Sequence, residues 1–201
     1  MNFKVKALLA IVAVSASSLA LAQNKNFTGF SAGVNVNFAN TTAEFSGTNV
    51  GATPIKNSKS DQNGALQAQY GFGISDKFVV GLGLTYGIGE LKAETGGTAR
   101  AKLKDMYSIN IEPGYVVSAR TLVYGKVAFQ NAKGEITQGA ATASDNLTGT
   151  GFGIGFRFML MPKLYLQGEF VQASYDKRNI FTGTAMKPDT GVASIGVGYN
   201  F

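Results

Sequence analysis

Four charged residues interrupt stretches that otherwise carry almost no charge: Glu112, Lys126, Arg157 and Glu169. Two carboxylates could work as a general acid and a general base if their environments differed. If the chain reverses around Ala119, however, Glu112 falls opposite Lys126 on a neighbouring strand. A reversal at residues 161–163 likewise places Arg157 opposite Glu169 or one pair away. Because each carboxylate then has a cation beside it and the four charges cancel, the spacing favours a buried ion network over catalysis.

Histidine and cysteine are both absent from the chain. Ser-His-Asp catalysis, histidine general bases, histidine and thiolate metal sites and disulfides are therefore unavailable. The sequence accordingly predicts no catalytic residue, no metal site and no cofactor, and thus a protein that is not an enzyme. The 18 Lys and Arg and 12 Asp and Glu are scattered without a block of like charge, so no nucleic-acid surface is expected.

The N-terminus has the three parts of a secretory signal peptide. Lys4 and Lys6 give a positive start, residues 7–16 form an apolar run, and Ala20-Leu21-Ala22 supplies a small-x-small cleavage pattern. We therefore expect residues 1–22 to be a cleaved signal peptide and residues 23–201 to form one domain. No later segment approaches the roughly 18 consecutive apolar residues of a membrane helix, so insertion into a membrane would have to use strands.

Eight later stretches alternate in polarity with a period of two, which is typical of β-strands. They lie within residues 30–38, 66–74, 78–88, 101–117, 123–130, 151–160, 164–170 and 193–201. One face of each stretch carries Phe, Leu, Ile, Val and Tyr, and the other carries Gly, Ser, Asn and Gln with few charges. Pro113 cannot donate to a strand ladder, so a bulge or a locally widened pairing is expected there.

The composition of the two faces indicates which one points outward. A soluble barrel would need a hydrated, charged outer face, whereas here the polar face is made of small residues and the apolar face is nearly continuous. Small polar side chains suit the crowded interior of eight strands, and an uncharged apolar face suits lipid. Unpaired backbone groups are costly in hydrocarbon, so the sheet must close. The predicted fold is all-β, an eight-stranded antiparallel up-and-down transmembrane β-barrel.

The predicted connections alternate between short and long. Residues 75–77, 118–120 and 161–163 form tight turns, whereas residues 40–63, 90–100, 131–148 and 174–190 are predicted as long loops. This asymmetry is typical of outer-membrane barrels and places both termini on the periplasmic side. Cations of the long loops could contact lipopolysaccharide phosphates, or could simply keep the loops soluble. These cations are Lys56, Lys59, Lys92, Arg100, Lys133, Lys177, Arg178 and Lys187.

The end of the chain carries the most specific motif. Ser194-x-Gly196-x-x-Tyr199-x-Phe201 resembles the C-terminal β-signal that the barrel-assembly machinery reads, and its aromatic residues would lie in a periplasmic girdle. With this motif and its eight alternating stretches, the chain resembles the small eight-stranded outer-membrane barrels, namely the OmpA transmembrane domain and OmpX-like surface proteins. The resemblance implies a place in the bacterial outer membrane, contact with its lipid and lipopolysaccharide, and a lumen plugged by salt bridges.

These observations predict a structural or surface-interacting barrel, and they leave rival functions open. One is a narrow pore for ions or small solutes, because many lumen positions are glycine. Another is an adhesin or receptor whose long loops bind an unknown extracellular ligand. A channel for hydrophobic ligands is disfavoured because few inward positions are apolar: Val79, Met106, Met159 and Val171.

Overall fold

A computed structural model of the chain describes residues 24–47, 51–94, 99–138, 140–181 and 184–201. The predicted signal peptide, residues 1–22, lies outside the described residues. The elements are η1 (Lys25–Phe27), β1 (Gly29–Gly47), β2 (Gly51–Gly73), β3 (Phe78–Ile88), β4 (Leu91–Glu94), β5 (Ala99–Ser118), β6 (Thr121–Gln138), β7 (Ala141–Met159), β8 (Leu164–Tyr175), β9 (Arg178–Phe181) and β10 (Thr184–Asn200). In this part of the chain no helix is long and apolar enough to cross a membrane.

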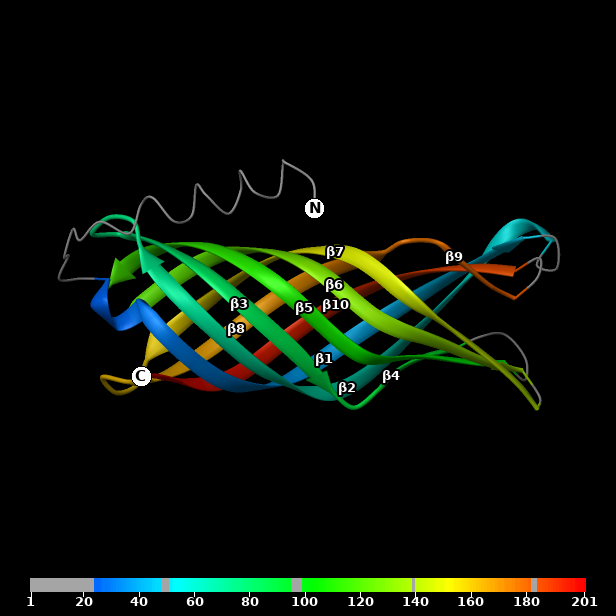
Figure 1. Ribbon diagram of the computed structural model, residues 1–201, viewed down its shortest axis with the longest axis horizontal. Helices are drawn as coiled ribbons and strands as arrows, with labels where there is room; N and C mark the ends of the chain where they lie inside the picture. The colour runs from blue at the N-terminus through cyan, green and yellow to red at the C-terminus, as the bar shows by residue number, and fades with distance from the viewer. Residues whose placement is uncertain (1–23, 48–50, 95–98, 139, 182–183) are drawn as a thin grey trace, which may run out of the picture.

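Eight of the strands close into an antiparallel barrel, which confirms the predicted fold (Figure 1). Their order is β1-β2-β3-β5-β6-β7-β8-β10, and β10 returns to pair with β1 from Ser31↔Asn200 to Ser46↔Ala185. β4 and β9 are short additions that pair with β5 and β10. The tight turns and the C-terminus lie at one end, here called the turn end, and the strands run on to the opposite, extended end.

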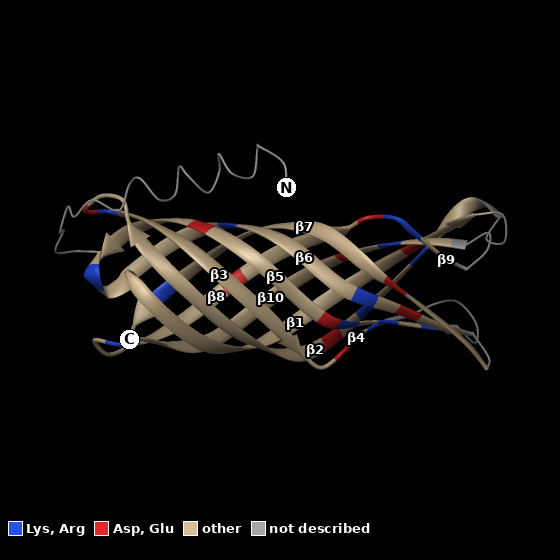
Figure 2. Cartoon of the chain, viewed as in Figure 1, with Lys and Arg blue, Asp and Glu red and all other residues tan. Residues whose placement is uncertain are grey.

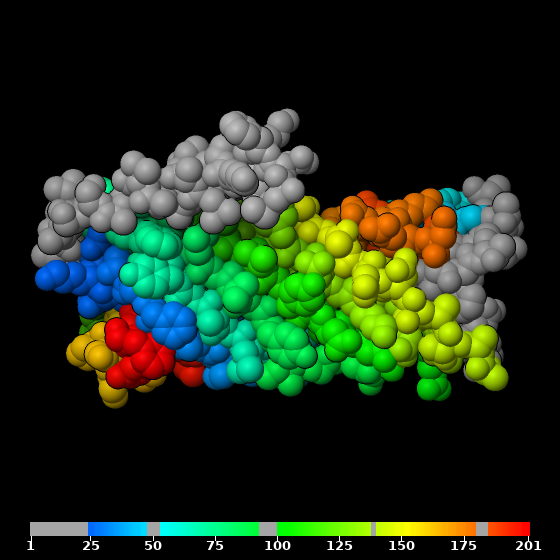
Figure 3. All heavy atoms as spheres, in the orientation of Figure 1, coloured from blue at the N-terminus to red at the C-terminus, as the bar shows by residue number. Residues whose placement is uncertain are grey.

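The two faces of the sheet point as predicted. Outward apolar side chains form a band around the wall and remain exposed, from Phe30 and Tyr199 near the turn end to Phe38 and Phe129 farther along. Buried inward positions include Ser31, Asn35, Gln67, Gln69, Ser108 and Asn110. Figure 3 shows tightly packed side chains over the coloured part of one side of the tube. Small polar residues therefore line the lumen, and the apolar band is left for lipid.

The predicted long loops are mostly strand, so that part of the prediction is wrong. β1 and β2 stay paired as far as Gly47↔Gly51, with a register shift after Phe45, and β6 and β7 as far as Gln138↔Ala141. Beyond the apolar band the outward positions carry Thr, Asn, Ser and Lys, as at Thr42 and Ser58. These residues face water on the outside, so the strands lose the polarity contrast that reveals strands in a sequence.

The register of β5 against β6 shifts at Asp105 and again between Val116 and Ser118, and not at Pro113, where the pairing with β6 is interrupted at Glu112 and Pro113 without a bulge. Around Pro113 the register with β6 is unshifted, because Ile111 pairs with Val127 and Gly114 with Tyr124. At Asp105 the φ angle is 50° and the register does shift. This bulge turns Lys104 outward, although a strict period of two would place it inward beside Met106.

The extended end divides into two flaps (Figure 1). The first flap consists of β9, β10, β1 and β2, and the second consists of β4, β5, β6 and β7. Among the described residues, pairing between β2 and β3 ends at Gly64↔Ile88, and pairing between β7 and β8 ends at Gly149↔Tyr175. Beyond these points β4 pairs only with β5 and β9 only with β10, so two seams without a strand ladder separate the flaps.

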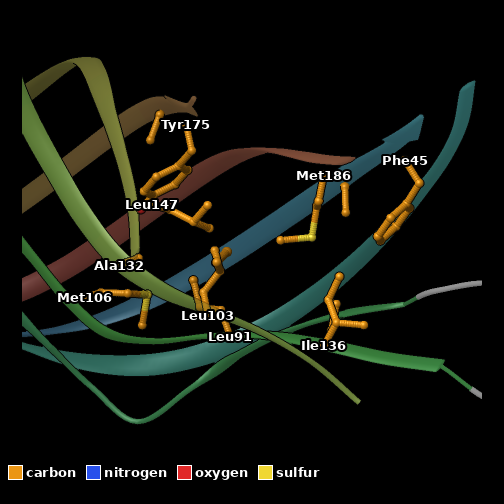
Figure 4. Close-up of a cluster of buried hydrophobic side chains, with 13 residues drawn as sticks. Phe45, Leu91, Leu103, Met106, Ala132, Ile136, Leu147, Tyr175 and Met186 are labelled. Atoms are coloured by element: carbon orange, nitrogen blue, oxygen red, sulfur yellow. The ribbon is translucent and has the colours of Figure 1, made fainter. Parts of the chain in front are cut away.

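An apolar cluster inside the extended end packs the flaps together (Figure 4). Phe45 and Met186 come from the first flap, and Leu103, Ile136 and Leu147 come from the second. The prediction that few inward residues are apolar was therefore wrong at this end. Most of the cluster lies in segments predicted as loops, for which the sequence offered no inward face.

Candidate functional site

The four charged residues singled out in the sequence meet in the lumen. Glu112 and Lys126 lie on neighbouring strands, with Glu112 Oε1 3.1 Å from Lys126 Nζ. Glu112 Oε2 lies 2.6 Å from Arg157 Nη2, and Lys126 Nζ lies 2.7 Å from Glu169 Oε2. The side chains are at most 6% exposed, so two acids and two bases form a continuous ion chain across β5, β6, β7 and β8. We call these four residues the ion network.

Arg157 does not form the ion pair with Glu169 that the spacing suggested. β7 and β8 pair in the register Arg157↔Gln167, and Arg157 Nε donates to Gln167 Oε1 at 2.9 Å. The guanidinium instead reaches over β6 to Glu112 on β5. Glu169 instead accepts hydrogen bonds from Lys126 Nζ and from the hydroxyl of Tyr124, the latter at 2.9 Å.

Glutamines connect the ion network to the opposite wall of the barrel, and no spacing in the sequence predicts this role. Arg157 also donates to Gln69 Oε1 on β2. Gln167 Nε2 donates to Gln67 Oε1 at 3.0 Å, and Asn35 Nδ2 donates to the same oxygen at 3.1 Å. β2 lies across the ring from β7, so polar contacts span the whole lumen at this level. The one sequence feature that pointed to these amides was their position on the polar, inward face of the predicted strands.

A second apolar cluster lies between the ion network and the turn end. It consists of Phe27, Val79, Val116, Leu122, Tyr124, Met159 and Tyr165. The rings of Tyr124 and Tyr165 face the Arg157 guanidinium, with centroids 4.9 and 5.4 Å from its Cζ. These cation–π contacts help to stabilise the buried guanidinium.

A cavity of about 100 Å³ lies on the other side of the ion network, below the flaps. Lys126 and Glu169 border it together with amides such as Asn35 and Asn110, and Val171 and Met106 supply apolar lining. The volume exceeds what one water molecule needs. From the turn end outward, the lumen thus holds an apolar cluster, the ion network, a mixed cavity and the apolar cluster of the flaps.

The residues of the C-terminal motif lie along β10. Gly196 faces the lumen where a Cβ would collide with the Asn35 side chain and lie 2.4 Å from the Val34 carbonyl oxygen, so only glycine fits. Ser194 pairs with Glu169 of β8 and Asn37 of β1. Tyr199 and Phe201 are exposed on the outer wall at the turn end, with ring centroids 5.3 Å apart. Their placement matches an aromatic girdle, while their part in assembly stays a prediction.

The predicted lipopolysaccharide-contacting cations all lie at the extended end, mainly on strand extensions. Figure 2 shows charge concentrated there and sparse along the apolar band. Arg100, Lys177, Arg178 and Lys187 are exposed. Lys56 forms an ion pair with Glu44 at 3.1 Å, Lys59 and Lys133 are half-buried, and the backbone N–H of Lys92 donates to Asp61.

No group of three or more potential metal ligands occurs among the described residues. Both lumen carboxylates are held by cations, an arrangement of structural ion networks. A closed eight-stranded barrel with an apolar outer band and a polar, ion-paired lumen defines an outer-membrane β-barrel protein.

Comparison with known families agrees with that class. Residues 7–201 match the family described as outer membrane protein beta-barrel domain, and the chain belongs to this family. This membership implies the bacterial outer membrane as its location. No curated protein sequence matches the chain.

Solved structures share the fold at low sequence identity. Ail, the attachment invasion locus protein of Yersinia pestis, solved with the heparin analogue sucrose octasulfate, is 15% identical with a TM-score of 0.53. That match covers 87% of this chain and 100% of Ail. The outer membrane protein AlkL, solved in lipid bilayers, is 15% identical with a TM-score of 0.56, covering 92% of this chain and 94% of AlkL. These likenesses concern the fold alone.

Proposed function

We propose that the protein is a non-enzymatic outer-membrane barrel with a closed lumen, whose role is structural or surface-interacting. The observation that carries this proposal is the set of polar contacts that reaches from Glu112 on β5 through Arg157 to Gln69 on β2. A solute would have to break buried, charge-assisted hydrogen bonds to pass this level. The apolar clusters on either side add two further barriers to an ion.

The chemistry of the lumen also argues against catalysis. A general acid or base needs an accessible proton, yet Glu112 and Glu169 are buried and each is held by a cation. With no histidine in the chain, no other side chain titrates near neutral pH without perturbation. The ion network is therefore best explained as a structural plug.

The extended end would then be the part of the barrel that contacts molecules outside the membrane. Its strands continue beyond the apolar band and carry exposed cations, which supports contact with anionic groups outside the membrane, including lipopolysaccharide phosphates. A second candidate function, an adhesin for anionic glycans, draws support from Ail, a protein of this fold that was solved with a sulfated sugar analogue. The exposed Arg100, Lys177 and Arg178 are the residues to test for it.

Planar-bilayer recording of the purified barrel tests the plug. The wild-type protein should show little or rare opening, and Glu112→Ala combined with Arg157→Ala should raise the conductance. Glu90→Ala, which removes an exposed ion-pair partner of Lys102, is the matched control and should leave conductance unchanged. Steady conductance through the wild-type barrel would overturn the closed lumen and favour the narrow pore.

A further inference from the structure

The outer wall carries a polar hollow of about 800 Å³ across four neighbouring strands, β8, β10, β1 and β2. Its polar lining residues are Asn40, Thr42, Ser60, Asp61, Gln62, Gln172 and Asp189. Phe38 and Phe170 also line it, and Gly191 and Ala193 occupy its floor on β10. Its volume is in the range of small-molecule binding sites, although it lies on the outside of a membrane barrel. We call this feature the wall hollow.

The wall hollow begins where the apolar band ends. On β1 the outward positions pass from Val36 and Phe38 to Asn40 and Thr42, and then to Glu44. The other three strands change in the same way, and on β8 Phe170 is followed by Gln172. In an outer-membrane barrel this transition marks the boundary between hydrocarbon and headgroups. The extended end faces away from the periplasm, so these headgroups belong to the outer leaflet.

The shape of the wall hollow follows from missing side-chain bulk at Gly191 and Ala193. A Cβ at Gly191 would lie 3.1 Å from Gln172 Oε1 and 3.8 Å from the Phe170 ring, so added atoms would project among the lining residues. Beside them, Asn40 Nδ2 donates to Ser60 Oγ at 3.0 Å. The hydroxyls of Thr42 and Ser58 lie 2.8 Å apart. Cross-strand hydrogen bonds therefore hold the polar lining in place.

The chemistry of the lining is that of sugar recognition. Amides and hydroxyls offer both donors and acceptors, Asp61 and Asp189 add carboxylate acceptors, and the rings of Phe38 and Phe170 lie at the apolar edge. Neither Lys nor Arg is among the lining residues, so the hollow does not suit a bare phosphate. A sugar ring that carries hydroxyl and amide substituents and has apolar faces would complement this set of groups.

We infer that the wall hollow binds the sugar headgroup of an outer-leaflet glycolipid, with the acyl chains lying along the apolar band below. This inference rests on the proposed orientation, in which the extended end is extracellular. It differs from the predicted cation contacts because the recognised groups are neutral sugar hydroxyls and amides rather than phosphates.

Two variants and a matched control test the inference. Ala193→Phe fills the hollow with an outward ring, and the double variant Asn40→Ala/Gln172→Ala removes polar groups without adding bulk. Asn131→Phe places the same ring at an outward position on β6, opposite Tyr107 and two strands away from β8, the nearest strand of the hollow. Each barrel is refolded into detergent and titrated with purified lipid A, with a phospholipid of matched acyl chains, and with the free glucosamine disaccharide. Bound lipid is counted by native mass spectrometry.

The wild-type barrel and Asn131→Phe should bind lipid A saturably and more tightly than the phospholipid. Ala193→Phe and the double variant should weaken lipid A binding about tenfold, the effect of losing one or two hydrogen bonds. Competition by the disaccharide would identify the sugar as the recognised part. Equal binding of lipid A by all four proteins, or equal binding of phospholipid and lipid A, would overturn the inference. Conductance and heat-modifiable migration of the same samples report on the closed barrel separately, so failure of either proposal can be recognised alone.

Discussion

Glu112 is the residue on which the ion network depends most, because its two carboxylate oxygens face two different cations. Oε2 bonds to Arg157, while Oε1 lies near Lys126 and accepts no hydrogen bond of good geometry within the described part of the chain. Removing one partner of a buried ion network costs far more than removing an exposed one, since the remaining charge stays in a poorly solvated site.

Glu112→Gln should therefore lower the free energy of unfolding by about 3–5 kcal/mol, because Arg157 loses its only carboxylate contact among the described residues. Urea unfolding in detergent, followed by the heat-modifiable shift in migration, measures this change. Glu90→Gln at the rim should change stability by less than about 1 kcal/mol. Equal losses of unfolding free energy in the two variants would show that the lumen network stabilises the barrel no more than an exposed ion pair does.

Asp61 lies on β2 beyond the apolar band, at the seam where β2 faces β4 without a strand ladder. Backbone N–H groups of Gln62 and Lys92 donate to its carboxylate at 2.9 and 3.1 Å. The Gln62 N–H, followed by the Lys92 N–H and the nearby lysine charges, holds the pKa of Asp61 below its usual value. A depressed carboxyl pKa means that this contact is complete above the usual Asp range and is lost as the pH falls through the folded-state pKa.

We expect the amide shift of Lys92 to move with the carboxyl carbon shift of Asp61 when the pH is lowered below the usual range of an Asp. A solution NMR titration in detergent follows both signals. In Asp61→Asn the Lys92 amide should no longer titrate. A midpoint at or above the usual Asp pKa would contradict the assigned contact.

The flaps illustrate how strands are held together without a ladder. At the seam where the pairing of β7 with β8 ends, Thr148 Oγ1 donates to Asp176 Oδ2 at 2.8 Å. The Asp176 N–H donates to the Thr148 carbonyl, also at 2.8 Å. Beyond these contacts the described pairing between the flaps stops, and the apolar cluster around Leu147 packs them together. Packing of side chains, rather than backbone hydrogen bonds, therefore stabilises the closed extended end.

Leu147→Asp should separate the flaps, because it places an unpaired charge at a site that is 0% exposed. Trypsin should then cleave the extended end at least several times faster, while the membrane-embedded part stays folded. Ser144→Asp adds the same charge at an exposed position of the same strand and should have no effect. Unchanged proteolysis of Leu147→Asp would mean that the cluster does not hold the flaps.

The outer wall of the whole molecule meets two environments, hydrocarbon along the apolar band and water beyond it. Along the apolar band the outer wall faces hydrocarbon, so its outward residues resemble a protein core turned inside out, and Ile154 is 69% exposed. Beyond the band the same strands face water and carry charge (Figure 2). The boundary between these regions also locates the wall hollow.

Ile154→Arg should reduce the yield of folded barrel, because a cation at mid-depth on the lipid face costs roughly 2–4 kcal/mol. The folded fraction after refolding into bilayers measures this loss. Asn146→Arg, on the same strand beyond the band, should refold like the wild type. If both variants refold equally, Ile154 does not face lipid.

The sequence alone predicts the number of membrane strands, the face that meets lipid, and the register that places Glu112 beside Lys126. These features follow from a period of two and from turns between neighbouring strands, which are local properties of the chain. The partners of Arg157, the glutamine bridge to β2, the two flaps and the wall hollow depend on the tertiary structure. They bring together residues such as Gln69 and Arg157, 88 positions apart, which become neighbours only when β10 closes on β1. The strand extensions also escaped prediction, because beyond the membrane the outer wall faces water and no lipid requires its outward residues to be apolar.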